Sequence, residues 1–503
     1  MGIEFPVWSL AAYRGSSACS EGASEGRQGV SEENWDWREW KILKTLNTLR
    51  GSIIRLAFWS FVGMFILTVD VPKKQENSAM ARSSTIHTVA DAFFEPMRKA
   101  LSLSKHTREC PNFSDWEHLS AGVGRCLERA QSGRDWIQQL WHQFSMKVGV
   151  SCFFESLGSA RRLKLLQEVN ARIVSDCDAS AGSDDDPFST HTELDNFGIY
   201  AADGHYHACS AHEDRIDGKR YAVGHFFATN LRTQSMRHLD VARPKRKRES
   251  DITALKRLNP EALRMCEPRG RKVFIAYDPA VVDFRQWHNW KQAKGVYIVT
   301  REKENMALIC CGEPEFDRND PRNNGVVSDE WVGHSYGRMI RRIVYVDPAT
   351  GKEYRFITNE MTLPPGLVAF VYKKRWDIEK MFDQMKNKLL ERKAWAKSPT
   401  AKCQQATFMC LTHNLMLILE RGIDETEAIA DDKVRARMAA RVRRDTEKAE
   451  AAGRAMNPLL LGVRRSVQRS LQFIRWLRWA LTHATSWRPA IDELRPLMAQ
   501  YMA

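Results

Sequence analysis

Two aspartates in this chain follow short apolar segments that predict buried strands. Asp203 comes after the apolar residues 197–202, and Asp278 comes after residues 273–277. Adjacent strands would bring both carboxylates to one end of a sheet, where a third carboxylate from a packed helix could join them. Such clusters of hard oxygen ligands suit Mg²⁺ or Mn²⁺, and two of these ions can support phosphodiester cleavage.

The third carboxylate is expected on a helix spanning about 367–392. Apolar residues recur through 371–389 at helical spacing and form one stripe. A narrow band of polar residues borders this stripe: Tyr372, Arg375, Glu379 and Lys386. A carboxylate there could point into a groove while its basic and phenolic neighbours hold a phosphate backbone. Periodicity alone favours a solvated flank with an Arg375–Glu379 pair, and it leaves Asp383 as an alternative to Glu379.

The spacing of these polar residues carries a family resemblance. Tyr372-x-x-Arg375-x-x-x-Glu379, with Lys386 seven residues later, resembles the YREK signature of bacterial insertion-sequence transposases. The neighbouring sequence at 283–305 is similar as well, and the resemblance covers roughly residues 195–420. It implies a DDE-type catalytic domain of the α/β class. The expected fold is an RNase H-like mixed sheet with an inserted β subdomain, flanked by helical N- and C-terminal regions.

The resemblance also implies roles for individual residues. It assigns the catalytic and metal-binding triad to Asp203, Asp278 and Glu379. It assigns DNA contacts near the scissile end to Tyr372, Arg375 and Lys386. The implied cofactor is Mg²⁺ or Mn²⁺, as two ions, and the implied partner is double-stranded DNA held by a homodimer. The implied activity is metal-dependent cleavage at element ends followed by strand transfer into target DNA.

One position departs from the family pattern. Arginine usually follows the second aspartate, whereas this chain has Pro279, which leaves Asp283 as an alternative ligand. A catalytically impaired, DNA-binding relative of the transposases would fit this departure. A nuclease of the same fold that lacks strand transfer is the other alternative.

The remaining sequence divides around the catalytic segment. Residues 80–178 are predicted to be helical, and their basic side chains suit either DNA binding or a soluble bundle. A linker at 179–194 contains an acidic run that we expect to be solvated. Residues 305–362 are predicted to form the β insertion, with a hairpin inside it. The basic helical region 421–503 is expected to contact DNA or another protomer, and its stretch 459–481 could also face a membrane.

The composition narrows the class of protein. Of 503 residues, 76 are Lys or Arg and 62 are Asp or Glu, which gives a net charge of +14. This surplus favours a polyanionic partner. The eleven cysteines include no Cys-x-x-Cys pair, which argues against a disulfide framework and fits the cytosol. The composition therefore predicts a cytosolic, basic, globular protein, and the charge alone does not separate nucleic acid from an acidic membrane surface as the partner. The family resemblance implies a cytoplasmic, DNA-associated protein, and no Walker loop or dinucleotide fingerprint indicates a nucleotide cofactor.

The N-terminal residues do not fit this picture. Residues 1–79 are predicted to be an atypical, partly disordered extension with a short apolar segment and no part in the chemistry. The uncharged run at 56–69 is shorter than the ~20 residues that cross a bilayer. A buried helix and a membrane tether through 52–70 are the alternatives.

Overall fold

The computed structural model describes most of the chain after its first 86 residues. The described residues are 87–128, 132–143, 146–182, 185–243, 249, 251–333 and 338–499. The predicted extension at 1–79, with its apolar segment, lies outside them. Within the described ranges, no helix combines the length and the apolar character that crossing a membrane requires.

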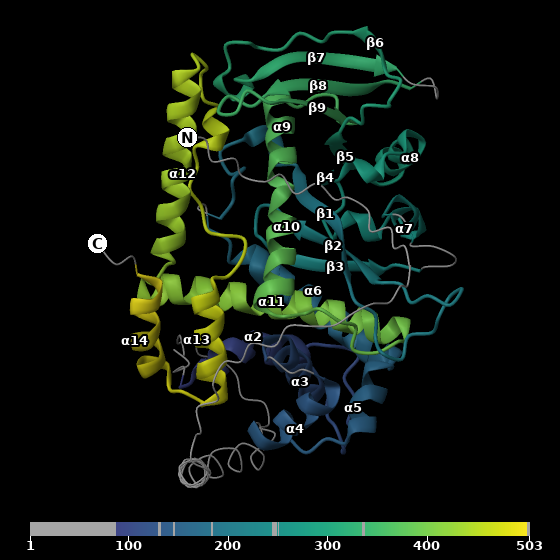
Figure 1. The fold of residues 1–503 in the computed structure, drawn as a ribbon, viewed down its shortest axis with the longest axis vertical. Coiled ribbons are helices and arrows are strands. Elements are labelled where there is room, and N and C mark those ends of the chain that lie inside the picture. Colours follow the sequence, from purple (N-terminus) through teal and green to yellow (C-terminus); the bar gives the residue numbers. More distant parts are fainter. Residues whose placement is uncertain are drawn as a thin grey trace, which may run out of the picture. The chain divides into compact units, whose positions relative to one another are not determined.

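Helices fill the described part of the region that precedes the catalytic segment (Figure 1). They are α2 (Val89–Ser102), α3 (Asp115–Leu127), α4 (Gly133–Gln143), α5 (Val150–Leu157) and α6 (Ala160–Ala179). Local sequence explains where some of them begin. The Ser114 side chain and Glu117 form a capping box at the start of α3, which satisfies backbone N–H groups that have no partner inside the helix.

The sheet of the described region has nine strands (Figure 1). They are β1 (Phe197–His207), β2 (Val223–Asn230), β3 (Met236–Val241), β4 (Lys272–Ala276), β5 (Val296–Arg301), β6 (Ile309–Gly312), β7 (Val326–Gly333), β8 (Ile340–Val346) and β9 (Glu353–Thr358). Their order is β3-β2-β1-β4-β5-β9-β8-β7-β6. The pairs β1–β4 and β4–β5 are parallel and all others are antiparallel. The predicted α/β class with a mixed, RNase H-like sheet is confirmed.

The predicted β insertion continues this sheet. Strand β9 pairs with β5, so that β6 to β9 extend the central strands as one layer. The predicted hairpin is formed by β8 and β9, whose register places Val346 opposite Glu353. In its turn Gly351 has a φ of +70°, a left-handed conformation that glycine adopts without strain.

Helices cover both faces of the sheet because its central strands are apolar on both sides. Ile199 on β1 and Phe274 on β4 pack with α9 (Pro365–Lys374), α10 (Trp376–Asp383) and α11 (Pro399–Glu427). Ile275 on β4 faces the other way and packs with Trp287 and Trp290 of α8 (Phe284–Lys294) and with α7 (Asp251–Arg257). Helix α10 lies on β1, which sets its position relative to the strand that carries Asp203.

Several elements differ from the sequence-based expectation. The helix predicted at 367–392 is interrupted at Arg375, which joins α9 to α10, and it ends in a π-helical turn at Gln384–Lys388. Strand β1 continues through Asp203 to His207, because β2 pairs along its whole second half. Strand β3 was not predicted, since its polar residues gave no apolar alternation.

The C-terminal region is also helical where it is described, with α12 (Asp432–Ala451), α13 (Leu471–Thr482) and α14 (Trp487–Met498). The stretch 459–481 was left open as a DNA, protomer or membrane surface. Instead, four of its arginines point into the protein: Arg464, Arg465, Arg469 and Arg478. Their positive charges are used in ion pairs or in bonds to backbone carbonyls.

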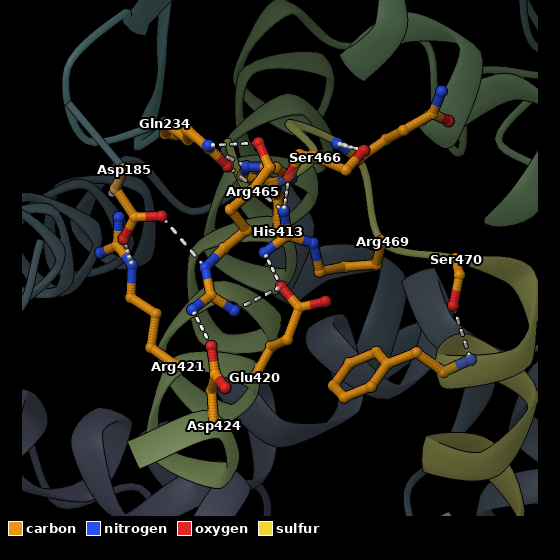
Figure 2. A network of polar contacts seen from close by, with 12 residues as sticks. Asp185, Gln234, His413, Glu420, Arg421, Asp424, Arg465, Ser466, Arg469 and Ser470 are labelled. Atoms are coloured by element: carbon orange, nitrogen blue, oxygen red, sulfur yellow. Dashed lines mark hydrogen bonds and ion pairs between the residues drawn. The ribbon is translucent and has the colours of Figure 1, made fainter. Parts of the chain in front are cut away.

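The acidic linker at 179–194 is less solvated than expected. Asp185 is buried and forms ion pairs with Arg421 at 2.8 Å and Arg465 at 3.0 Å (Figure 2). Asp186 pairs with Arg232 at 2.6 Å. The expectation of a solvated run was therefore wrong for these two aspartates, because cations from distant segments meet them.

Candidate active site

The two aspartates follow the same end of the parallel ladder between β1 and β4. The parallel ladder between β1 and β4 ends at the pair Ala201–Ala276, and Asp203 and Asp278 each lie two residues beyond it. Neighbouring strands are about 4.8 Å apart, so the two residues lie on adjacent strand segments just beyond their last paired residues. Asp203 stays within β1, opposite Phe227 of β2.

Asp278 begins a short 3₁₀ turn. Its Oδ1 accepts a hydrogen bond from the backbone N of Ala280 at 2.8 Å, and Pro279 takes the first position of the turn. Proline suits that position because its fixed φ matches the turn and the backbone N–H it lacks would have no partner there. The departure at Pro279 thus has a local structural explanation.

Arg375 connects Asp203 to Glu379. Its Nη1 donates to Oδ2 of Asp203 at 3.2 Å, and its Nη2 donates to Oε1 of Glu379 at 2.7 Å. Arg375 and Glu379 are four residues apart in helical backbone, which places them on one face. The guanidinium is 10% exposed, and the carboxylates are 16% and 32% exposed, so the bridge lies at a solvent-accessible margin of the protein.

Tyr372 lies beside the same cluster. The guanidinium carbon of Arg375 is 5.8 Å from the centroid of its ring. Burial raises the pKa of Tyr372, and the carboxylate of Asp278 contributes in the same direction against the opposing charges of Arg375 and Arg301. Asp278 is therefore within electrostatic range of Tyr372, and the phenol remains protonated at neutral pH.

Lys386 lies in the π-helical turn that follows α10 and is exposed. Burial lowers the pKa of His205 to about 4, and the positive charge of Lys386 also lowers it. His205 is two residues beyond Asp203 on β1, and its ring packs against Phe382 in a tilted arrangement with the centroids 4.9 Å apart. The positive charge of Lys386 therefore acts on a residue of the strand that carries Asp203.

The alternative carboxylates have other contacts. Asp283 caps α8, where it accepts a hydrogen bond from the backbone N of Gln286 at 2.9 Å, and it pairs with Lys256. Asp383 is exposed and accepts a hydrogen bond from Asn387 at 2.6 Å. As candidate cation ligands, Glu379 is favoured over Asp383 by its contact with Arg375, and Asp278 is favoured over Asp283 by the strand register.

The donor chemistry of the cluster fits a hard divalent cation, because carboxylate oxygens are the ligands that Mg²⁺ and Mn²⁺ prefer. Across the described ranges, however, no three His, Cys, Asp or Glu side chains are arranged to hold a metal ion. The guanidinium of Arg375 explains this for Asp203 and Glu379, since it binds an oxygen of each. A cation held between these two carboxylates would compete with Arg375 for their oxygens.

A cavity of about 260 Å³ opens next to Arg375. Its walls combine cationic and aromatic side chains from β5, β8, the β8–β9 turn, β9 and α9: Arg301, Tyr345, Lys352, Tyr354, Phe356, Tyr372 and Lys373. Asp347 also lines the cavity and pairs with Lys373 at 3.1 Å. Trp376, the first residue of α10, also lines it and is 57% exposed. Cations can pair with phosphates and aromatic rings can stack on bases, so this lining suits a nucleic-acid strand.

The cavity residues outside the helix were not found from the sequence. Tyr354 and Phe356 alternate on one face of β9, and Arg301 ends β5. Strand alternation therefore signalled a shared face for the two aromatic residues. It could not show that this face meets Tyr372, because that contact depends on how α9 packs on the extended sheet.

Comparison with known families was informative for the central segment. Residues 186–415 match a family described as "Transposase DDE domain". This range contains all the candidate site residues: Asp203, Asp278, Tyr372, Arg375, Glu379 and Lys386. A comparison with curated proteins found no match.

Proposed function

The chain carries a transposase DDE domain at residues 186–415, and from this premise we propose that it cuts DNA at the ends of an insertion element and joins those ends to target DNA. The observation that best supports this activity is the bridge through Arg375, which links Asp203 of β1 to Glu379 of α10. Asp278 leaves the sheet at the same edge. These carboxylates come from separate segments, as a cation site between a sheet and a helix requires.

In this proposal Asp203, Asp278 and Glu379 would hold Mg²⁺ or Mn²⁺, as two ions. When bound, such ions activate a water molecule and stabilise the charge on the departing oxygen in phosphodiester cleavage. The protein's own contribution is to hold the carboxylates at the sheet edge and to place the DNA backbone against them.

Arg375 has two roles in this scheme. Without cation or DNA it neutralises Asp203 and Glu379, which would otherwise repel each other. With cations held by the carboxylates, its guanidinium would be free to form a bidentate contact with a phosphate near the cleaved bond. The protonated phenol of Tyr372 can donate a hydrogen bond to the same backbone, and the exposed ammonium of Lys386 can pair with a phosphate further along.

The partner in this proposal is double-stranded DNA carrying terminal inverted repeats. We propose a homodimer that holds two such ends together, located in the cytoplasm and associated with DNA. The cavity supports a close approach of one strand, since its cations and aromatic rings lie next to Arg375, which binds Asp203 and Glu379.

The test uses the full-length protein and linear DNA carrying the inverted repeats that flank the gene. With Mn²⁺ or Mg²⁺ present, the wild-type protein should nick the repeat ends and join them to a target plasmid. Glu379→Gln should abolish cleavage while end binding in a gel-shift assay changes little, because the amide keeps the shape but loses the anionic ligand.

Asp383→Asn serves as the matched control, since it removes a carboxylate from the same helical segment. Cleavage retained by Glu379→Gln would refute the assignment. Nicking without joining would indicate a nuclease of this fold, and end binding without nicking would indicate a catalytically impaired relative.

A further inference from the structure

The C-terminal strap, residues 457–470, runs along the catalytic helix although it lies beyond the matched domain. It contains one short 3₁₀ turn, Pro458–Leu460, and is otherwise irregular. Of its arginines, Arg469 is fully buried, and Arg464 and Arg465 are mostly buried, with side chains 9% and 14% exposed. Burying charges is costly unless each one is paired, so the partners of these arginines show what the strap holds in place.

Both ends of the strap are fixed to parts of the protein other than α10. At its start, Nδ2 of Asn457 donates to the backbone carbonyls of Arg322 at 2.7 Å and Asn324 at 3.0 Å. Near its end, Arg465 pairs with Asp185 at 3.0 Å and with Asp424 at 2.6 Å (Figure 2).

Arg469 completes this anchor. Its guanidinium is fully buried and pairs with Glu420 of α11 at 2.5 Å (Figure 2). The strap is therefore attached to α11 and to the insertion side of the sheet independently of the catalytic helix.

Between these anchors the strap binds the back of α10. The guanidinium of Arg464 forms an ion pair with Asp377, and the two side chains are 9% and 5% exposed. Asp377 also accepts from Nζ of Lys380 at 2.9 Å. Burial raises the pKa of Asp377, but the charges of Arg464 and Lys380 outweigh it and hold the pKa below its usual value.

Asp377 lies two residues before Glu379, roughly on the opposite side of the helix. The Arg464 contact thus fixes the back of the helix whose front carries Glu379.

A second group of contacts holds the π-helical turn after α10. The backbone N of Arg469 donates to Oε1 of Gln384 at 2.5 Å, and Nζ of Lys388 donates to the carbonyl of Arg469 at 2.6 Å. Gln384 is in turn bonded to His413 of α11 at 3.0 Å. π-Helical turns are uncommon and need such support from their surroundings.

The local sequence of α10 provides few contacts that would hold the helix in position. Arg375 joins α9 to α10 without any side-chain cap, and the π-helical turn replaces an ordinary C-terminal end. Its position therefore depends on packing and on contacts from outside.

We propose that Arg464 and Asp377 are positioning residues, through which the C-terminal strap sets the place of Glu379 relative to Asp203. The inference rests on the proposed function for its catalytic consequence, but the position of α10 is a property of the protein alone. A purely stabilising ion pair would affect the whole fold. A positioning pair affects α10 and the steps that need Glu379.

The test compares Arg464→Gln with Arg341→Gln in the full-length protein. Arg341 pairs with Asp329 at 2.5 Å, and both side chains are at least as buried as the Arg464 pair, but they lie on β7 and β8 within the insertion. Hydrogen exchange of the amides at 376–383 should accelerate at least about tenfold in Arg464→Gln and stay unchanged in Arg341→Gln. Arg464→Lys, which keeps the charge, should restore part of the protection.

The catalytic readout is Mn²⁺-dependent cleavage per folded molecule. Arg464→Gln should cut about 10- to 100-fold more slowly, as expected for a displaced catalytic group, while end binding stays within about twofold. The double variant Asp377→Leu with Arg464→Leu removes both buried charges and should recover stability but not cleavage.

Unchanged exchange in α10 of Arg464→Gln would overturn the inference, as would recovery of cleavage in the double variant. If the wild-type protein cuts no DNA, the proposed function fails, and the exchange measurement still decides whether the strap positions α10.

Discussion

Replacing Arg375 with glutamine should make the protein bind Mn²⁺ more tightly in the absence of DNA. In the wild-type protein the guanidinium donates charge-assisted hydrogen bonds to Asp203 and Glu379. Each bond of this kind is worth about 1.5–3 kcal/mol when both groups are buried. Because the two carboxylates are 16% and 32% exposed, water screens them, and we expect their combined contribution to be about 2 kcal/mol.

That contribution has two measurable consequences. Without divalent cations, Arg375→Gln should lower the free energy of unfolding by about 2 kcal/mol, because two carboxylates lose a shared counter-charge. In the proposed mechanism, cation binding to the wild-type protein displaces Arg375 and so loses the same contacts. Removing them should therefore raise the apparent Mn²⁺ affinity about 10- to 30-fold, since 1.4 kcal/mol corresponds to a factor of ten.

Isothermal titration with Mn²⁺ measures the affinity, and thermal unfolding in chelator or in Mn²⁺ measures the stability. Arg341→Gln is the control, because it also removes a buried arginine but leaves the carboxylate cluster intact. A folded Arg375→Gln protein that binds Mn²⁺ no better than the wild type would refute the reasoning. Asp203 and Glu379 would then not share a cation site.

Three further perturbations test other parts of the structure. Lys386→Gln should lower the slope of log binding constant against log salt by about 1 for DNA ends, and an unchanged slope would exclude a phosphate contact. Glu391 is buried, which raises its pKa to about 7, so that folding favours its protonated form and stability falls as pH rises from about 4.5 to 7. The free energy of unfolding of Glu391→Gln, measured in urea relative to wild type, should therefore rise by about 2–3 kcal/mol between pH 5 and pH 8. A difference that does not change with pH would contradict this. Gly366→Ala should destabilise the protein by about 1–3 kcal/mol in the same assay, because an added Cβ would lie 1.9 Å from the backbone O of Arg322. Wild-type stability would show that α9 can shift.

Much of the site could be predicted from the sequence because its geometry follows from local periodicity. The apolar runs before Asp203 and Asp278 predicted strands, and parallel pairing then placed both residues at one edge. Helical spacing likewise placed Arg375 and Glu379 on one face. Periodicity alone left Asp283 and Asp383 open as alternative ligands. The strand register and the contacts of Arg375 favour Asp278 and Glu379 instead.

What the sequence could not show depends on contacts between distant segments. The i,i+4 pair of Arg375 and Glu379 was visible in the sequence, but the bond from Arg375 to Asp203 joins residues 172 positions apart. From the sequence, the basic residues of the strap were interpreted as a possible surface for a polyanion. The sequence does not show that they form ion pairs with buried acids such as Asp377 and Glu420. Interruption of the helix at Arg375 was equally hidden, since no proline or glycine marks it.

Because of the ion pairs of the strap, we expect the recognised domain to be shorter than the smallest piece of this protein that folds. A chain ending at residue 415 would leave Asp185 without its partners Arg421 and Arg465, and Asp377 would keep Lys380 but lose Arg464. Removing one partner of a buried ion pair costs about 3–5 kcal/mol, which is a large share of the stability of an ordinary domain. Truncation at the boundary of the family match should therefore yield an insoluble or unfolded product. Functional dissection of this protein is better pursued by point substitution than by shortening its C-terminus.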